Sequence, residues 1–266
     1  MSELPLHSTS SNEETAIPSG KFFSLTDESS PLLGQHTLKK DICDQEWWRL
    51  LHYGGFCMGG ITFLIGTLLY YPTIYDTAKG NDSGALTLSV VTAWLYTIGS
   101  AGFLFVDVQE FYTFTDDIML RINISCSMIG SFFYLVGSAG FLPIFYNWCP
   151  LIGIIGFLAG SLFIGCSQTW KLVRILSSSD EEGIAPEIIS FQRLNAACVE
   201  GGAMVGGYSF LIGTSFFWKG PIEGDAECLI TCNNYEIVLA LWVLGSLAFT
   251  FGGVSLAYRH IVLKIT

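Results

Sequence analysis

Three carboxyl groups and one imidazole lie inside or at the ends of long apolar stretches. Glu200 stands within the run Asn195-Ala-Ala-Cys-Val-Glu-Gly-Gly-Ala, His52 near the start of the first stretch, and Asp107 and Glu110 at the end of the second. Ionisable groups inside a membrane are costly and are functional candidates by default. Carboxylates beside a histidine, which titrates near neutrality, can bind a proton or a cation. We therefore predict an intramembrane ionisable site in a proton-coupled or ion-coupled carrier.

Glu200 also has a structural interpretation. It can pair with Arg193 or Arg121, or bond Asn195, and so serve helix packing and topology. The sequence leaves both interpretations open.

The elements that must position these groups are six apolar stretches. The chain has 266 residues, of which 51% are hydrophobic and 13% charged, whereas about a quarter of the residues are charged in soluble domains. About twenty apolar residues in a helix cross a bilayer, and only helices or closed barrels satisfy the backbone there. The stretches are too long and continuous for barrel strands. The predicted helices cover residues 48–71, 85–106, 122–141, 151–172, 194–218 and 237–258.

The lysines and arginines that flank these stretches predict the orientation. If the N-terminus is cytosolic, ten of the twelve lie on the cytosolic side and two outside, as the positive-inside rule requires. The two outside are Lys79 and Lys219, and the ten inside are Lys21, Lys39, Lys40, Arg49, Arg121, Lys171, Arg174, Arg193, Arg259 and Lys264. We expect an all-α integral membrane protein with both termini cytosolic. It lies in the lipid bilayer, and its first span acts as its own signal.

Residues 1–44 form a polar tail that precedes the membrane domain, residues 45–266. Its composition is typical of disorder. It contains Glu28-Ser-Ser-Pro-Leu32-Leu33, which resembles an acidic dileucine sorting signal. That resemblance implies binding to clathrin adaptor complexes and residence in a lysosomal, vacuolar or endosomal membrane, with the plasma membrane as the alternative.

The predicted non-cytosolic loops hold two candidate modification sites. Asn81-Asp-Ser is an N-glycosylation acceptor pattern on the expected side. Cys228 and Cys232 share the last such loop, and Cys149 lies in the middle one. A disulfide among these cysteines is compatible with an oxidising lumen.

An internal repeat runs through all six stretches. It consists of an aromatic residue, two further residues, a glycine, and then serine or threonine. The glycines are Gly66, Gly99, Gly137, Gly160, Gly213 and Gly245. Glycine permits close approach of two helices, and the following hydroxyl can bond across the interface or back to its own helix. Additional small residues in alternate stretches favour a helical hairpin as the unit, repeated three times.

The segments Phe63-Leu-Ile-Gly-Thr and Tyr134-Leu-Val-Gly-Ser-Ala-Gly-Phe-Leu resemble motifs of the YrhK-like membrane domain. The resemblance covers the spans and not the tail. It implies a small multi-pass membrane module and supplies no catalytic residues.

The residue types favour no enzyme, cofactor, metal or nucleic-acid site. Four histidines, two of them in the tail, cannot supply clustered metal ligands, and the chain lacks a basic nucleic-acid footprint. Two functions remain. One is a carrier or channel for a small solute or ion. The other is a non-transporting scaffold or assembly factor that binds partner helices, in a homo-oligomer or hetero-oligomer.

Overall fold

The computed structural model describes residues 45–71, 73–74, 82–113, 117–149, 151–177, 186–217 and 235–264. Every regular element in these ranges is a helix. The long helices are α2 (Glu46–Leu69), α4 (Asp82–Thr113), α5 (Ile118–Gly140), α7 (Leu151–Ser177), α8 (Pro186–Phe217) and α11 (Tyr235–Ile261), and α6 (Pro143–Tyr146) is a single turn.

All six long helices are long and apolar enough to cross a membrane. The shortest has 23 residues, which at ~1.5 Å per residue exceeds the ~30 Å of a bilayer core. Each predicted stretch overlaps one of these helices, so the prediction of a six-span membrane protein is confirmed.

Several helices are longer than the hydropathy pattern predicts, α4 and α8 by the most. α4 continues to Thr113 rather than ending near residue 106, so Asp107 and Glu110 lie within the helix. α8 begins at Pro186 instead of near residue 194, and proline suits a first helical position because it has no N–H left to satisfy there. The α4 extension carries the buried Asp107 inside the bundle.

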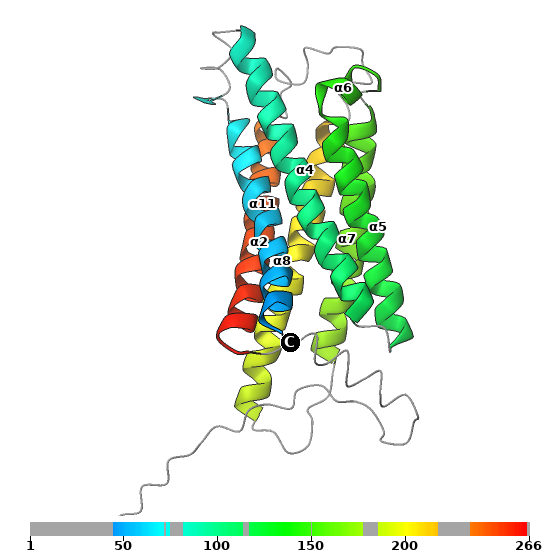
Figure 1. Ribbon diagram of the computed structural model, residues 1–266, viewed down its shortest axis with the longest axis vertical. Coiled ribbons are helices and arrows are strands. Elements are labelled where there is room, and N and C mark those ends of the chain that lie inside the picture. The colour runs from blue at the N-terminus through cyan, green and yellow to red at the C-terminus, as the bar shows by residue number, and fades with distance from the viewer. Residues whose placement is uncertain are drawn as a thin grey trace, which may run out of the picture.

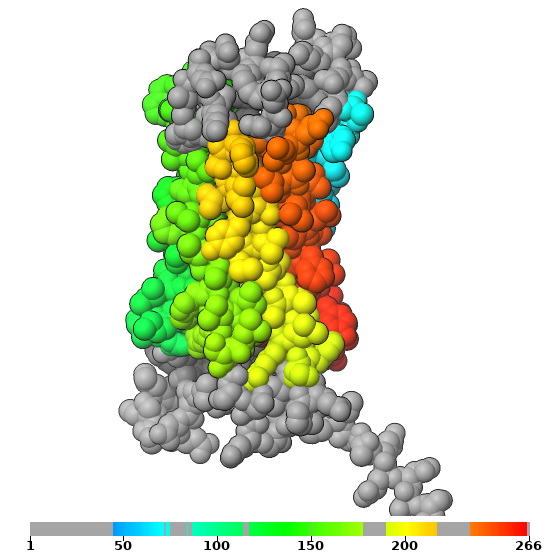
Figure 2. Space-filling view, turned by 180° about the vertical axis from the view of Figure 1, so that it is seen from behind, coloured from blue at the N-terminus to red at the C-terminus, as the bar shows by residue number. Residues whose placement is uncertain are grey.

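The six helices form a closed ring. Each packs against its neighbours along the chain, and α11 packs back against α2. The chain alternates in direction, and the end where α2 begins and α11 ends is called the base; it lies at the bottom of Figure 1. Seen from behind in Figure 2, α8 lies between α7 and α11. Side chains near the ends of α4 and α7 thus meet those near the start of α2 and α5.

Aromatic rings fill the centre of the ring of helices. Phe63 and Tyr134 are fully buried and their ring centroids lie 5.8 Å apart, within the range in which aromatic pairs attract each other. All six aromatic residues of the repeat belong to this cluster. The aromatic cluster comprises Phe63, Tyr96, Phe103, Tyr134, Phe157, Phe210, Trp242 and Phe249.

Each aromatic ring of the repeat packs against a repeat glycine of a neighbouring helix. A Cβ built on Gly99 would lie 2.7 Å from Phe63 Cδ2, and one on Gly66 would lie 3.3 Å from Tyr96 Cε1. The aromatic residue of α2 therefore packs on the glycine of α4, and the aromatic residue of α4 packs on the glycine of α2. The same reciprocal packing joins α5 to α7 and α8 to α11, through Gly137 with Phe157, Gly160 with Tyr134, Gly213 with Trp242, and Gly245 with Phe210.

The hydroxyl that follows each glycine is also buried. Ser100 Oγ lies 2.8 Å from Ser138 Oγ across the α4–α5 contact. Thr67 Oγ1 lies 3.2 Å from Ser246 Oγ across the α2–α11 contact and donates to its own helix at Phe63 O, 2.8 Å away. Hydroxyls thus bond both across the interface and back along the helix, which holds helices together where apolar contact alone gives little specificity.

The outer surface of the bundle is apolar. Large hydrophobic side chains are exposed along the middle of the helices, among them Ile65, Trp94, Phe132, Leu162, Ile212 and Phe251. A patch of this extent is unusual for a soluble protein. It is suited to contact with the lipid bilayer.

Candidate functional site

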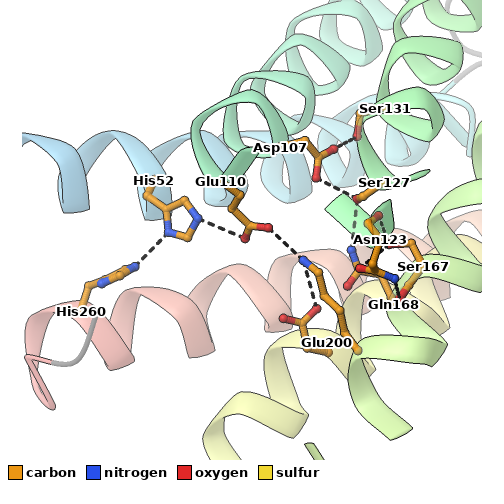
Figure 3. A network of polar contacts seen from close by, with 11 residues as sticks. His52, Asp107, Glu110, Asn123, Ser127, Ser131, Ser167, Gln168, Glu200 and His260 are labelled. Carbon is orange, nitrogen blue, oxygen red and sulfur yellow. Dashed lines mark hydrogen bonds and ion pairs between the residues drawn. The ribbon is translucent and has the colours of Figure 1, made fainter. Parts of the chain in front are cut away.

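Polar side chains from all six long helices meet in the half of the bundle nearer the base (Figure 3). This set is called the base network. It comprises His52 of α2, Asp107 and Glu110 of α4, Asn123, Ser127 and Ser131 of α5, Ser167 and Gln168 of α7, Glu200 of α8, and His260 of α11, together with Lys171 of α7, which contacts Glu110 and Glu200. The aromatic cluster begins directly above it, since Phe103 lies four residues, or about 6 Å of helix, before Asp107.

Two histidines and a glutamate form one arm of the base network. His52 Nδ1 lies 3.0 Å from His260 Nε2, and His52 Nε2 lies 3.3 Å from Glu110 Oε1. Both imidazoles are buried, and the Trp48 ring stacks on His52 with centroids 4.8 Å apart. A carboxylate only accepts, so His52 Nε2–H donates to Glu110 and His52 Nδ1 either accepts from His260 or carries a second proton. The arm can therefore take up one proton without rearranging its heavy atoms.

Lys171 connects this arm to Glu200. Its Nζ lies 2.9 Å from Glu110 Oε2 and 4.0 Å from Glu200 Oε2. The Lys171 side chain is 10% exposed, and the two carboxylates are mostly covered. The desolvation of three charges is compensated only while the lysine stays between its partners. Protonation of either carboxylate would weaken its ion pair with Lys171.

Asp107 forms a second arm with serine partners. Ser127 Oγ donates to Asp107 Oδ1 at 2.7 Å, and Ser131 donates to Asp107 Oδ2. Gln168 Nε2 donates to Ser127 Oγ at 3.3 Å. Asn123 and Ser167 bond each other beside these groups, with Ser167 Oγ 3.1 Å from Asn123 Oδ1. Two buried hydroxyls thus hold the Asp107 carboxylate between α4 and α5.

The structure brings together residues that are far apart in the sequence. Of the four predicted site residues, His52 contacts Glu110 directly, and Lys171 bridges Glu110 to Glu200. Asp107 lies one turn from Glu110 on α4 and faces α5 instead. The predicted convergence toward one end of the bundle is therefore observed, with Asp107 in its own arm.

Lys171 and His260 are members of the base network that the sequence did not single out. Lys171 looks like one of the flanking cations that set topology, and His260 lies in the last turn of α11. The signal available for both was helical phase. Lys171 follows Ile164 by seven residues and Gln168 by three, and all three are buried on one face of α7. His260 follows Leu256 by four residues, and both are buried in α11.

The structural interpretation of Glu200 named other partners than the one found. The ion pair of Glu200 in the described residues is with Lys171. Asn195 Nδ2 donates to Ser255 O at 3.2 Å, and Arg121 lies over the Phe111 ring at 5.1 Å. Arg259 of α11 also attracts Glu200 electrostatically.

A separate ion pair closes the outer edge of the base. Arg174 Nη2 lies 2.7 Å from Asp117 Oδ2, and Asp117 caps α5 by accepting from Met119 N at 2.9 Å. Burial works against the charged form, but backbone hydrogen bonds at the start of α5 and the Arg174 guanidinium hold the pKa of Asp117 below its usual value. This carboxylate stays ionised and ties α5 to α7 at the water-facing end.

Several predicted sites lie outside the described residues. These are the sorting signal Glu28, Leu32 and Leu33, the glycosylation acceptor Asn81, and the cysteine pair Cys228 and Cys232. Cys149 forms no disulfide with another described residue. Within the described ranges, no group of three histidine, cysteine or acidic residues is placed to hold a metal ion.

No protein-family model, curated protein or solved structure matches this chain. The resemblance of its motifs to the YrhK-like domain stays a prediction.

Proposed function

We propose that this protein is a proton-coupled carrier for a small solute, with the base network as its proton-binding site. The observation that most directly supports this proposal is a chain of side-chain contacts inside a membrane-spanning bundle. It runs from His260 through His52, Glu110 and Lys171 to Glu200. Charged groups at such a depth are retained mainly where a pathway or a coupling ion uses them.

The chain of contacts has the chemistry of a proton relay. Histidine can hold a proton near neutral pH, and glutamate can accept one from it through the 3.3 Å contact of His52 with Glu110. Protonation of Glu110 would weaken its hold on Lys171, and Lys171 would then move toward Glu200. A change of proton occupancy thus becomes a displacement of α7 relative to α4 and α8.

The position of the aromatic cluster favours a carrier over an open channel. Rings from all six helices occupy the centre of the bundle above the base network. Such a state is closed on the far side and has its ionisable groups toward the base. A carrier would pass the solute only after the rings and the glycines that seat them rearrange.

The reciprocal packing of rings on glycines supports a bundle made of three repeated hairpins. The pairs are α2 with α4, α5 with α7, and α8 with α11, and each pair uses the same two positions of the repeat in both directions. Parallel repeats in transporters surround a site near their common axis. Here that inference is an analogy at the level of the fold.

The lysine and arginine distribution supports a cytosolic base, and hence cytosolic termini. The dileucine segment, with Glu28, Leu32 and Leu33, would then meet clathrin adaptor complexes from a cytosolic tail. An endolysosomal or vacuolar membrane, with an acidic lumen, would supply the proton gradient that a proton-coupled carrier needs.

A flux measurement tests the proposal. The purified protein is placed in liposomes that enclose a pH-sensitive dye, a mixture of small organic and inorganic solutes is supplied outside, and a potassium diffusion potential drives protons inward. We expect the wild type to acidify the lumen several-fold faster than empty liposomes, and Glu110→Gln to lose most of this excess. The matched control is Glu46→Gln, which neutralises an exposed carboxyl in the first turn of α2, at the same end of the bundle. Wild-type flux equal to that of empty liposomes, or full flux in Glu110→Gln, contradicts the proposal.

The filled centre also supports a second candidate, a membrane scaffold or assembly factor that transports nothing. Its described repeat glycines face neighbouring helices of the same bundle, so a partner would meet the apolar outer surface instead. Co-purification of a membrane partner in a fixed ratio, together with absence of proton flux, would favour this candidate.

A further inference from the structure

The Asp107 arm has a feature that the relay does not use. The Asp107 side chain is 6% exposed, and it forms no ion pair within 4.0 Å among the described residues. Both of its oxygens face serine hydroxyls from α5. A buried carboxylate without a paired cation is costly, and either a proton or a bound cation offsets that cost.

The groups around Asp107 are hard oxygen donors. Ser127 and Ser131 supply hydroxyl oxygens, each with lone pairs that can turn toward an ion. Gln168 is 5% exposed, its Nε2 donates to Ser127, and its Oε1 has no hydrogen-bond partner among the described residues. A carbonyl oxygen left unpaired at such a depth carries a desolvation cost that a ligand would offset. In the bond to Ser127 the amide directs its NH2 group at the Asp107 arm, so a half-turn of the carboxamide would bring the unpaired oxygen to that position.

The number of charges selects the kind of cation. Calcium and magnesium sites rely on oxygen ligands that usually include several carboxylates or phosphates, whereas one carboxylate balances a single charge. Soft or transition metals prefer sulfur and imidazole, and neither contacts Asp107 in the described hydrogen bonds. One carboxylate, two hydroxyls and an amide oxygen suit a small monovalent cation.

We infer that Asp107, Ser127, Ser131 and Gln168 form a sodium-binding site between α4, α5 and α7. The ion would lie against the Asp107 carboxylate, and the serine hydroxyls would rotate so that their lone pairs face it. The inference does not require transport, since a binding site is testable in the purified protein. If transport occurs, the site lies one helical turn from Glu110 and would link sodium to the base network.

Thermal unfolding of the full chain in detergent tests the site. The apparent Tm is followed by tryptophan fluorescence as sodium chloride replaces choline chloride at constant ionic strength. A ligand that binds only the folded state raises the Tm along a saturating curve. We expect such a curve with sodium, a clearly smaller rise with potassium, and no dependence in Asp107→Asn. Glu46→Gln, which removes a distant exposed carboxyl, should keep the wild-type response.

Ser131→Ala is the second variant, because Asp107→Asn can also disturb folding. It removes one oxygen ligand without changing charge, so the sodium curve should shift to about tenfold higher concentration, the equivalent of ~1.4 kcal/mol, and still saturate. Equal curves in sodium and choline would overturn the inference. So would a potassium response as large as that of sodium, or an unchanged sodium curve in Ser131→Ala and Asp107→Asn.

Discussion

The ammonium of Lys171 lies 2.9 Å from the carboxylate of Glu110, although 61 residues separate them in the chain. The contact joins α4 to α7, two helices that are not neighbours in the ring. It therefore crosses the interior of the bundle below the aromatic cluster. Any change in the charge of either residue acts on the relative positions of helices on different sides of the ring.

Replacement of Lys171 should destabilise the protein strongly. Lys171→Met leaves Glu110 and Glu200 buried without their shared cation, and breaking a buried pair costs about 3–5 kcal/mol. The measurement is the apparent Tm in detergent. Lys264→Met, at an exposed position near the C-terminus, is the control and should unfold like the wild type. A Lys171→Met Tm equal to that of the wild type would mean that the ion pairs do not hold the helices.

The close approach of α5 and α7 at their glycines leads to a second prediction. A Cβ on Gly156 would lie 2.5 Å from Gly137 Cα, so Gly156→Ala must push α7 away from α5 and should cost about 1–3 kcal/mol. Gly54 has no atom within 4 Å of such a Cβ, and there alanine should be neutral or slightly stabilising, since it favours the helix by about 0.5–1 kcal/mol. Chemical unfolding in mixed micelles measures both. Equal effects of the two substitutions would refute the packing argument.

Asp117, at the edge of the base, should make a pH-dependent contribution to the free energy of unfolding. Asp117→Ala removes the cap of α5 and should cost about 1 kcal/mol near neutral pH. The folded protein holds the Asp117 pKa below its usual value, so this contribution is present above the unfolded pKa of about 3.9 and is lost as the pH falls through the lower folded pKa.

The free energies of unfolding of wild type and Asp117→Ala, compared from neutral to acidic pH, check this. The difference between them should narrow below about pH 4. Asp117→Asn keeps a capping oxygen and should lose less than the alanine variant. A difference that widens in acid would contradict the assigned direction of the pKa shift.

The spans could be predicted from sequence because length and hydropathy suffice to identify a membrane helix. The contacts of the site could not be, because they depend on ring closure and helical phase. His52 and His260 are 208 residues apart and meet only because α11 returns to α2. Lys171 lies near the end of its helix, where a lysine usually indicates the membrane surface, and only its phase on α7 turns it inward.

The repeat illustrates the same limit. The pattern of aromatic residue and glycine was visible in the sequence, and so was the expectation of close packing. That Phe63 would rest on Gly99 while Tyr96 rests on Gly66 was not, because a periodic pattern does not specify the register between two helices. Side-chain volume and the ring of six neighbours determine that register.

The sorting segment makes a prediction about location. The tagged wild type should concentrate on lysosomes or vacuoles, and the double variant Leu32→Ala/Leu33→Ala should move to the plasma membrane, because an adaptor pocket loses both apolar contacts. Fluorescence microscopy with organelle markers measures this, with Leu6→Ala in the same tail as the control. Identical locations of wild type and double variant would remove the adaptor proposal.

The most direct test of a proton-binding base network is the proton flux of Glu200→Gln in liposomes with the same outside solutes, measured across neutral and acidic pH beside the wild type. Glutamine keeps the size of the side chain and cannot share Lys171 as a charged partner or exchange a proton. We expect the proton flux to fall at least tenfold at every pH and to lose the pH profile of the wild type. Unchanged flux with an unchanged pH profile would contradict the proposal and leave the base network a structural support.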